Sequence, residues 1–252
     1  MTTLDPARLA EGLLEQTGGF ARAVAGADAG AQVPTCPEWR LADLVRHLGQ
    51  AHRWAAEQVR KGEPVPVPDP RTAVPVPPGE WAAWLRAGAD ELTEAIAQTG
   101  PDTEVWTILG RGPAVAWLRR MLNETSIHHY DAAVTTGAGF EIADDLAADA
   151  VTEAFELISA PGVYAINPAL AELRGQGETL ALRPDGMEGW LATRTPGGVR
   201  WARGDHEADV VMSGPVREIM LVLSRRVPPS AGTVRLHGDA ALLDHLLARM
   251  AF

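Results

Sequence analysis

One stretch, residues 41–61, reads LADLVRHLGQAHRWAAEQVRK and has the pattern of a single amphipathic helix. Five apolar residues recur in it at the spacing of one helical face: Leu41, Leu44, Val45, Leu48 and Ala55. The following segment, residues 62–79, contains seven prolines in eighteen positions, so it can hold neither a helix nor a central strand. The sequence therefore predicts a helix that ends in a long extended crossover.

Helical periodicity recurs on both sides of this pair. Three further segments show it: residues 5–26, 80–100 and 113–136. Four long helices with one long crossover are typical of a four-helix bundle, in which inward side chains on facing helices can build metal and cofactor sites. A fifth helix, predicted over 143–159, links this bundle to the rest of the chain.

The pattern changes after residue 177. Short apolar segments, separated by turn signals, predict strands at 179–183, 189–195, 199–202, 208–212 and 234–237. Helices are expected over 216–225 and 240–250. We therefore expect an α+β chain, in which residues 1–164 form the helical bundle and residues 165–252 form a small α+β domain with an antiparallel sheet.

The composition excludes several classes of protein. The chain has 252 residues and a formal net charge of −11, whereas proteins that bind nucleic acid usually present a basic surface. No segment approaches the roughly 18 consecutive apolar residues that a membrane span needs, and the first 14 residues lack the apolar core of a signal peptide. The single cysteine, Cys36, cannot form an internal disulfide. We expect a cytoplasmic protein that binds neither nucleic acid nor a membrane.

Two predicted helices carry the residue types of a metal site. Glu124 and His128 are four positions apart, so their side chains project from the same helical face. Alone, this spacing is more typical of a solvated surface pair. His47 lies at the edge of the apolar stripe of the 41–61 helix, where it can face the bundle interior. Two imidazoles and one carboxylate suit a catalytic zinc with an open fourth position, although they also bind other divalent ions.

Acidic residues near these histidines are candidates to support them. Asp131 follows His128 by three positions and Asp43 precedes His47 by four, so each can accept the second ring N–H of a ligand histidine. The alternative for both is ordinary polarity of a helix surface. His52 lies near the centre of its apolar stripe, which favours a hydrogen-bonded core histidine over a residue that reaches the metal cavity.

The other candidates carry weaker signals. His129 is one position past His128 and is expected to face elsewhere, and three histidines in the strand-rich part are expected at the surface: His206, His237 and His245. A nucleophilic role for Cys36 is an alternative that its surroundings do not favour, because Arg40 is the only basic residue near it in the sequence.

Three segments together resemble the mycothiol-dependent maleylpyruvate isomerase family. They are residues 33–39, VPTCPEW, residues 43–49, DLVRHLG, and residues 123–131, NETSIHHYD. The resemblance implies a DinB-like metal-binding bundle, and residues 208–215, ADVVMSGP, extend it to the sterol-carrier-like C-terminal domain of that family. It also places the family's metal ligands on His47, Glu124 and His128, and its catalytic arginine on Arg226, with Arg225 as the neighbouring alternative.

The family resemblance implies a function. It implies a metal-dependent enzyme that uses the thiol mycothiol as cofactor or co-substrate, and that isomerises a cis double bond by thiolate addition and elimination, as with maleylpyruvate. One alternative is a mycothiol S-transferase acting on an electrophilic metabolite, and another is a metal- or ligand-binding module without turnover. We expect a divalent metal, zinc by preference, small-molecule partners and a monomer or homodimer, and the residues that bind thiol and substrate are not identifiable from the motifs.

Overall fold

The computed structural model describes residues 4–69 and 75–250 and divides the chain into two compact units. Among the described residues, the helical unit comprises residues 4–142 and the sheet unit comprises residues 143–250. The α+β class expected from the sequence is confirmed. None of the helices in these described ranges is both long and apolar enough to cross a membrane.

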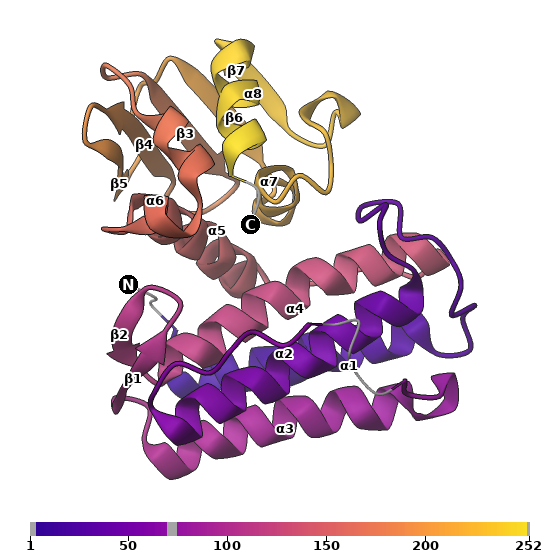
Figure 1. Cartoon of the computed structure of the whole chain (residues 1–252). Helices are drawn as coiled ribbons and strands as arrows, with labels where there is room; N and C mark the ends of the chain where they lie inside the picture. Colours follow the sequence, from indigo (N-terminus) through magenta and orange to yellow (C-terminus); the bar gives the residue numbers. More distant parts are fainter. Residues whose placement is uncertain (1–3, 70–74, 251–252) are drawn as a thin grey trace. The chain divides into compact units, whose positions relative to one another are not determined.

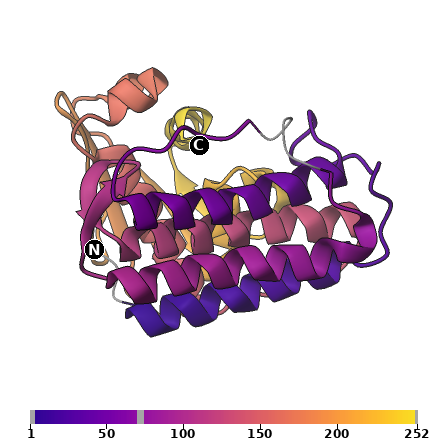
Figure 2. The same cartoon turned by 60° about the horizontal axis from the view of Figure 1, so that its bottom comes forward.

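The helical unit is the predicted four-helix bundle (Figures 1 and 2). Its helices are α1 (Pro6–Val24), α2 (Leu41–Lys61), α3 (Trp81–Thr99) and α4 (Val115–Thr136). α1 packs against α3 and α4, and α2 packs against the same two helices. A short 3₁₀ turn, η2 (Pro78–Glu80), leads from the proline-rich crossover into α3.

Local signals fix the ends of these helices. Asp5 accepts a hydrogen bond from the backbone N–H of Arg8 at 2.8 Å, and Pro6 occupies the first turn of α1, where no helical N–H partner is lost. α2 ends at Gly62, whose φ of 66° lies in the left-handed region that glycine adopts without a steric cost. The predicted bounds of both helices therefore agree closely with those observed.

One element of the helical unit was not expected. Strands β1 (Glu104–Thr107) and β2 (Gly110–Pro113) form a two-stranded antiparallel hairpin between α3 and α4. Each strand has only four residues, and β2 contains two glycines and a proline, so the segment lacks the β-branched alternation that predicts a strand.

The sheet unit begins with α5 (Asp144–Ser159) and contains a five-stranded sheet in the order β5-β4-β3-β6-β7. The strands are β3 (Thr179–Pro184), β4 (Trp190–Thr195), β5 (Gly198–Arg203), β6 (Val210–Gly214) and β7 (Arg235–Gly238). The helices α7 (Val216–Leu223) and α8 (Ala240–Arg249) follow β6 and β7. The remaining short elements are α6 (Val163–Ile166), η3 (Pro168–Leu173) and η4 (Pro229–Ala231).

The sheet is mixed rather than wholly antiparallel. β3–β4, β4–β5 and β6–β7 are antiparallel pairs, but β6 lies parallel to β3, with Leu180 opposite Val210. The β4–β5 hairpin occupies one side of β3, and β6 pairs in parallel with its other side.

The boundary between the units lies earlier than the expected division after residue 164. α5 belongs to the sheet unit, where it packs against α7 and β5. Phe155 of α5 stacks on Trp201 with ring centroids 6.3 Å apart, and Thr152 accepts a hydrogen bond from the indole of Trp190 at 3.1 Å. The apolar face of α5 therefore completes the core of the sheet unit, a role that its helical periodicity alone does not reveal.

Candidate metal site

The three predicted metal ligands lie together in the helical unit. His47 comes from α2, whereas Glu124 and His128 come from successive turns of α4. One potential ligand atom from each residue lies within 4.8 Å of the other two. The facing of α2 and α4 thus brings the three side chains to one place, as the bundle hypothesis requires, and their role as ligands remains a prediction.

Glu124 is held as a carboxylate. Its Oε1 lies 2.9 Å from Nε2 of His47, and its Oε2 lies 3.5 Å from the guanidinium of Arg120, one turn earlier on α4. Burial opposes ionisation of Glu124, but the hydrogen bond with His47 and the nearby positive charge outweigh it and hold the pKa of Glu124 below its usual range. An anionic oxygen is the form that a divalent cation binds.

The two ring nitrogens of His128 have different roles: Nδ1 makes a hydrogen bond, and Nε2 is available to a metal. Its Nδ1 lies 2.8 Å from Oδ2 of Asp131, and that carboxylate accepts the Nδ1–H, which leaves the Nε2 lone pair free for a metal. Burial lowers the pKa of His128, against the opposing effect of Asp131, so the imidazole favours its neutral, metal-binding form. Asp131, which is completely buried, therefore makes the hydrogen bond to the His128 ring that was expected, and its support of a metal ligand stays a prediction.

These donors fit a divalent ion. Ligand atoms bound to tetrahedral zinc at about 2.0–2.2 Å lie roughly 3.3–3.6 Å from one another. Atoms within 4.8 Å of one another can reach that spacing by small side-chain rotations. Two imidazoles and one carboxylate also leave a fourth position for an exogenous ligand, which is the arrangement of catalytic rather than structural zinc sites.

The other residues considered near this site have different roles. Asp43 accepts a hydrogen bond from the backbone N–H of Arg40 at 2.9 Å and pairs with Arg46, so it supports the start of α2 rather than orienting His47. His52 is fully buried, with its Nε2 2.8 Å from the Thr125 hydroxyl, as expected for a core histidine. His129 faces α1, where its Nδ1 lies 2.8 Å from Oε1 of Gln16.

Among the described residues, the histidines of the sheet unit belong to no such cluster. His206 and His237 are exposed, as expected for surface residues. His245 is partly covered, and its Nε2 lies 2.9 Å from the carbonyl oxygen of Glu172.

Three contacts at the site were missed in the sequence. Trp39 lies against both metal-site histidines, Cys36 contacts Asp131, and Arg120 pairs with Glu124. The spacing of four residues between Arg120 and Glu124 is a helical signal that could have indicated their pairing. The contacts of Trp39 with His128 and of Cys36 with Asp131 join residues about 90 positions apart, so no local sequence pattern predicts them.

Arg226 belongs to the sheet unit, just after α7. Its backbone N–H donates to the carbonyl of Leu221 at 2.8 Å, and its guanidinium donates to the carbonyl of Ser224 at 3.0 Å. The preceding residue, Arg225, is exposed and has a φ of 61°. The two arginines therefore differ in setting: Arg226 is partly buried and folded onto its own helix end, and Arg225 extends from a left-handed backbone position.

A four-helix bundle with a two-histidine, one-carboxylate cluster defines the class of this domain: a helical bundle with a candidate site for a divalent metal. Residues 10–133 match the family model described as mycothiol maleylpyruvate isomerase N-terminal domain. The helical unit therefore belongs to this N-terminal domain family, as the motifs in residues 33–49 and 123–131 indicated.

Solved structures agree with this assignment at the level of the fold. The chain is similar to the crystal structure of a mycothiol-dependent maleylpyruvate isomerase, with 19% sequence identity and a TM-score of 0.62 over 95% of this chain and 98% of that one. A crystal structure of a histidine-to-alanine mutant of such an isomerase matches with the same values. A comparison with curated proteins finds no match to this chain.

Proposed function

We propose that this protein is a divalent-metal enzyme that uses mycothiol to isomerise a cis double bond conjugated to a carbonyl, as in maleylpyruvate. The observation that carries the proposal is the cluster of His47, Glu124 and His128 inside a bundle of this family. We propose zinc as the metal, because zinc prefers four-coordinate sites built from nitrogen and oxygen ligands such as these.

The thiol must be ionised for this chemistry. A free thiol has a pKa of about 8.5 and is mostly protonated at neutral pH. A divalent ion held by His47, Glu124 and His128 would lower the pKa of a bound thiol and so supply the thiolate. The chain itself has the single cysteine Cys36, whose thiol donates to Asp131, so an external thiol is the reasonable nucleophile. The fourth, open position of the ligand set is where such a thiol would be accommodated.

The proposed reaction regenerates its thiol. The sulfur of the thiolate forms a bond to one alkene carbon, and the electron pair of the double bond moves onto the conjugated carbonyl as an enolate. The former double bond can then rotate, and return of the electron pair expels the thiolate and leaves the trans alkene. Arg226 is assigned to hold the enolate oxygen or a substrate carboxylate, since a guanidinium forms strong paired hydrogen bonds to such groups.

The sheet unit is proposed to be the sterol-carrier-like domain of this family. The support is the sequence segment 208–215, which spans β6 and its turn into α7, together with the position of Arg226 directly after that helix. Arg226 lies in the sheet unit, whereas the three proposed metal ligands lie in the helical unit.

One assay tests the function directly. The metal-loaded protein is mixed with mycothiol and maleylpyruvate, and both the trans product and the remaining free thiol are measured over time. Product formation with constant thiol supports the isomerase, whereas stoichiometric loss of thiol would establish a mycothiol S-transferase instead. Metal binding with neither reaction would show a non-catalytic module or a different substrate, and would contradict the proposal for maleylpyruvate.

A further inference from the structure

The loop of residues 32–40, which joins α1 to α2, has a fixed shape although it is not regular structure. Val33 N–H donates to the carbonyl of Trp39 at 3.1 Å, and Trp39 N–H donates to the carbonyl of Cys36 at 2.8 Å. The side-chain amide of Gln32 donates to the carbonyls of Pro37 and Trp39 at 2.6 and 2.9 Å. These bonds close the loop on itself, so Cys36 and Trp39 are held in defined positions.

Trp39 contacts both histidines of the metal site. Its ring centroid lies 4.7 Å from that of His47 and 5.9 Å from that of His128, and the two imidazoles lie edge to face at 5.0 Å. The imidazoles of His47 and His128 therefore contact each other, and both also contact the indole of Trp39. A ring packed in this way has few orientations available, which favours the orientation that the metal needs.

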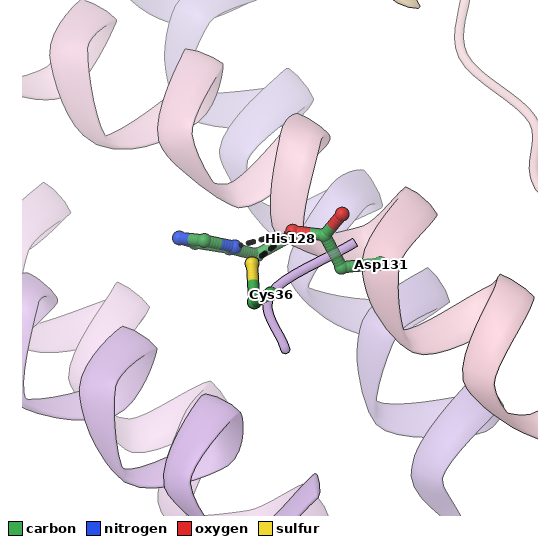
Figure 3. A group of neighbouring side chains, drawn as sticks. All are labelled: Cys36, His128 and Asp131. Atoms are coloured by element: carbon green, nitrogen blue, oxygen red, sulfur yellow. Dashed lines mark hydrogen bonds and ion pairs between the residues drawn. The ribbon is translucent and has the colours of Figure 1, made fainter. Parts of the chain in front are cut away.

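Cys36 lies beside His128 and Asp131 (Figure 3). Its Sγ donates to Oδ2 of Asp131 at 3.7 Å, and the same oxygen accepts the Nδ1–H of His128 at 2.8 Å. The buried carboxylate thus joins the thiol to the imidazole in a chain of Cys36, Asp131 and His128. A carboxylate held by a second donor keeps its hydrogen bond to a ligand histidine in one direction.

We propose that the loop of residues 32–40 positions the metal-binding imidazoles, through Trp39 on the rings of His47 and His128 and through Cys36 on Asp131. Both are positioning residues and neither is a ligand. This inference rests on the proposed metal site. It also accounts for why a loop far from α4 in the sequence closes so tightly beside it.

A competing arrangement makes Cys36 a ligand. Cys36, His128 and Asp131 also have potential ligand atoms within 4.8 Å of one another. An ion bound to Cys36 and Asp131 would have to displace the donors on Oδ2 of Asp131, which accepts from both Cys36 and His128 and belongs to a completely buried carboxylate. The hydrogen-bonded chain satisfies all three groups without an ion, and this favours the positioning role.

Titration with Co²⁺ tests the inference without reference to turnover. The dissociation constant and the visible absorption of the bound ion are measured for the wild type, Cys36→Ala, Cys36→Ser, Trp39→Ala and Trp39→Phe. We expect each alanine variant to bind Co²⁺ about 10- to 100-fold more weakly and with altered visible bands, as for other residues that orient metal ligands. Serine, which keeps a donor, and phenylalanine, which keeps an aromatic ring, should recover most of the affinity.

Controls separate positioning from folding. Glu38→Ala changes an exposed residue of the same loop and should leave Co²⁺ binding unchanged. The metal-free melting temperature of each variant shows whether it is folded, and Cys36→Val, which keeps the size of the side chain and lacks the donor, replaces Cys36→Ala if that variant does not fold.

Three results would overturn the inference in different ways. Wild-type affinity and spectrum in Cys36→Ala and Trp39→Ala would show that the loop does not position the site. A thiolate-to-cobalt charge-transfer band in the wild type, absent from Cys36→Ser, would make Cys36 a ligand. No Co²⁺ binding by the wild type would instead contradict the proposed metal site itself.

Discussion

Three buried histidines on facing helices have different chemistry because their neighbours differ. His128 bonds to a carboxylate through Nδ1, His129 to the amide of Gln16, and His52 to the hydroxyl of Thr125. A carboxylate fixes the imidazole and increases its basicity as a ligand, whereas neutral partners only satisfy a buried polar group. Residue type alone would not distinguish these three positions.

The first prediction concerns metal occupancy. Purified protein should carry about one divalent ion per chain, and His128→Ala should lower that occupancy steeply, because one of three protein ligands is lost. His52→Gln is the matched control, since its amide can still donate to Thr125 and His52 lies outside the cluster. Elemental analysis decides it: full occupancy in His128→Ala, or loss of metal in His52→Gln, would show that the ligands are wrongly assigned.

The second prediction is a loss of stability in mild acid. Burial lowers the pKa of His52 and of His129 from 6.5 to about 4, so below pH 6.5 the unfolded chain binds protons that the folded chain does not. The free energy of unfolding should therefore fall as the pH drops from 6.5 towards 4. At about 1.4 kcal/mol per pH unit, each histidine costs about 2 kcal/mol at pH 5.

Urea unfolding of the metal-free protein at pH 7 and pH 5 measures this loss. His52→Gln should reduce the difference between the two pH values without abolishing it, because His52 is one of three buried histidines with a lowered pKa, and His128 and His129 remain. An unchanged difference would mean that other groups cause the pH dependence.

At the scale of elements, the contact between α1 and α4 depends on a missing side chain. A Cβ at Gly19 would lie 2.3 Å from the His129 ring, which is itself held by Gln16 and packed against Phe140. A Cβ at the adjacent Gly18 would meet only the end of the Arg22 side chain at 3.4 Å. Substitutions at Gly18 and Gly19 can therefore be compared directly, because the two glycines lie in the same helix and only Gly19 is closely packed.

The third prediction is opposite effects at these two glycines. Gly19→Ala should destabilise the protein by about 1–3 kcal/mol, because the interface must move to accept the methyl group. Gly18→Ala should stabilise it by up to about 1 kcal/mol, since alanine favours the helix. Chemical denaturation measures both, and equal effects in one direction would contradict the close packing at Gly19.

The backbone at the end of α7 is strained, and this strain lowers the free energy of unfolding by a measurable amount. Arg225 N–H donates to the carbonyl of Val222 at 2.9 Å and Arg226 N–H to that of Leu221 at 2.8 Å, which is a Schellman motif with Arg225 at the left-handed position. Glycine usually occupies this position because a Cβ there costs roughly 1 kcal/mol.

The fourth prediction follows from that motif and also tests the catalytic arginine. Arg225→Gly should raise the free energy of unfolding by about 0.5–1 kcal/mol and keep turnover. Arg226→Ala should lose turnover and keep metal content, if Arg226 is the catalytic residue. Loss of turnover in Arg225→Gly with normal activity in Arg226→Ala would move the role by one position.

Local sequence patterns predicted most of the helices and strands, but they did not predict the contacts between residues far apart in the chain. The helices of the bundle are long and strongly periodic, and the spacing of Glu124 and His128 is itself a helical feature, so both could be found from the sequence. The parallel pairing of β6 with β3 depends on where the chain returns, and the contacts of Trp39 and Cys36 depend on the packing of the bundle. Such properties belong to the tertiary structure.

At the scale of the whole molecule, the division after residue 142 determines which fragments can fold. α5 carries apolar residues whose partners are in the sheet unit, as the stacking of Phe155 on Trp201 shows. A fragment that ends after α5 would keep this apolar face without its partners, and exposed apolar surface promotes association. Compact units are separable where few contacts cross the boundary.

The last prediction compares two fragments, residues 1–142 and residues 1–164. We expect fragment 1–142 to be helical, to unfold cooperatively and to bind one divalent ion as the intact chain does, because His47, Glu124, His128 and Asp131 all lie within it. Fragment 1–164 should bind more of a hydrophobic dye and associate, because α5 lacks the sheet. Circular dichroism, elemental analysis and size-exclusion chromatography measure these properties. If fragment 1–164 folds cooperatively as a monomer and fragment 1–142 does not, α5 stabilises the bundle, and the division of the chain lies after that helix.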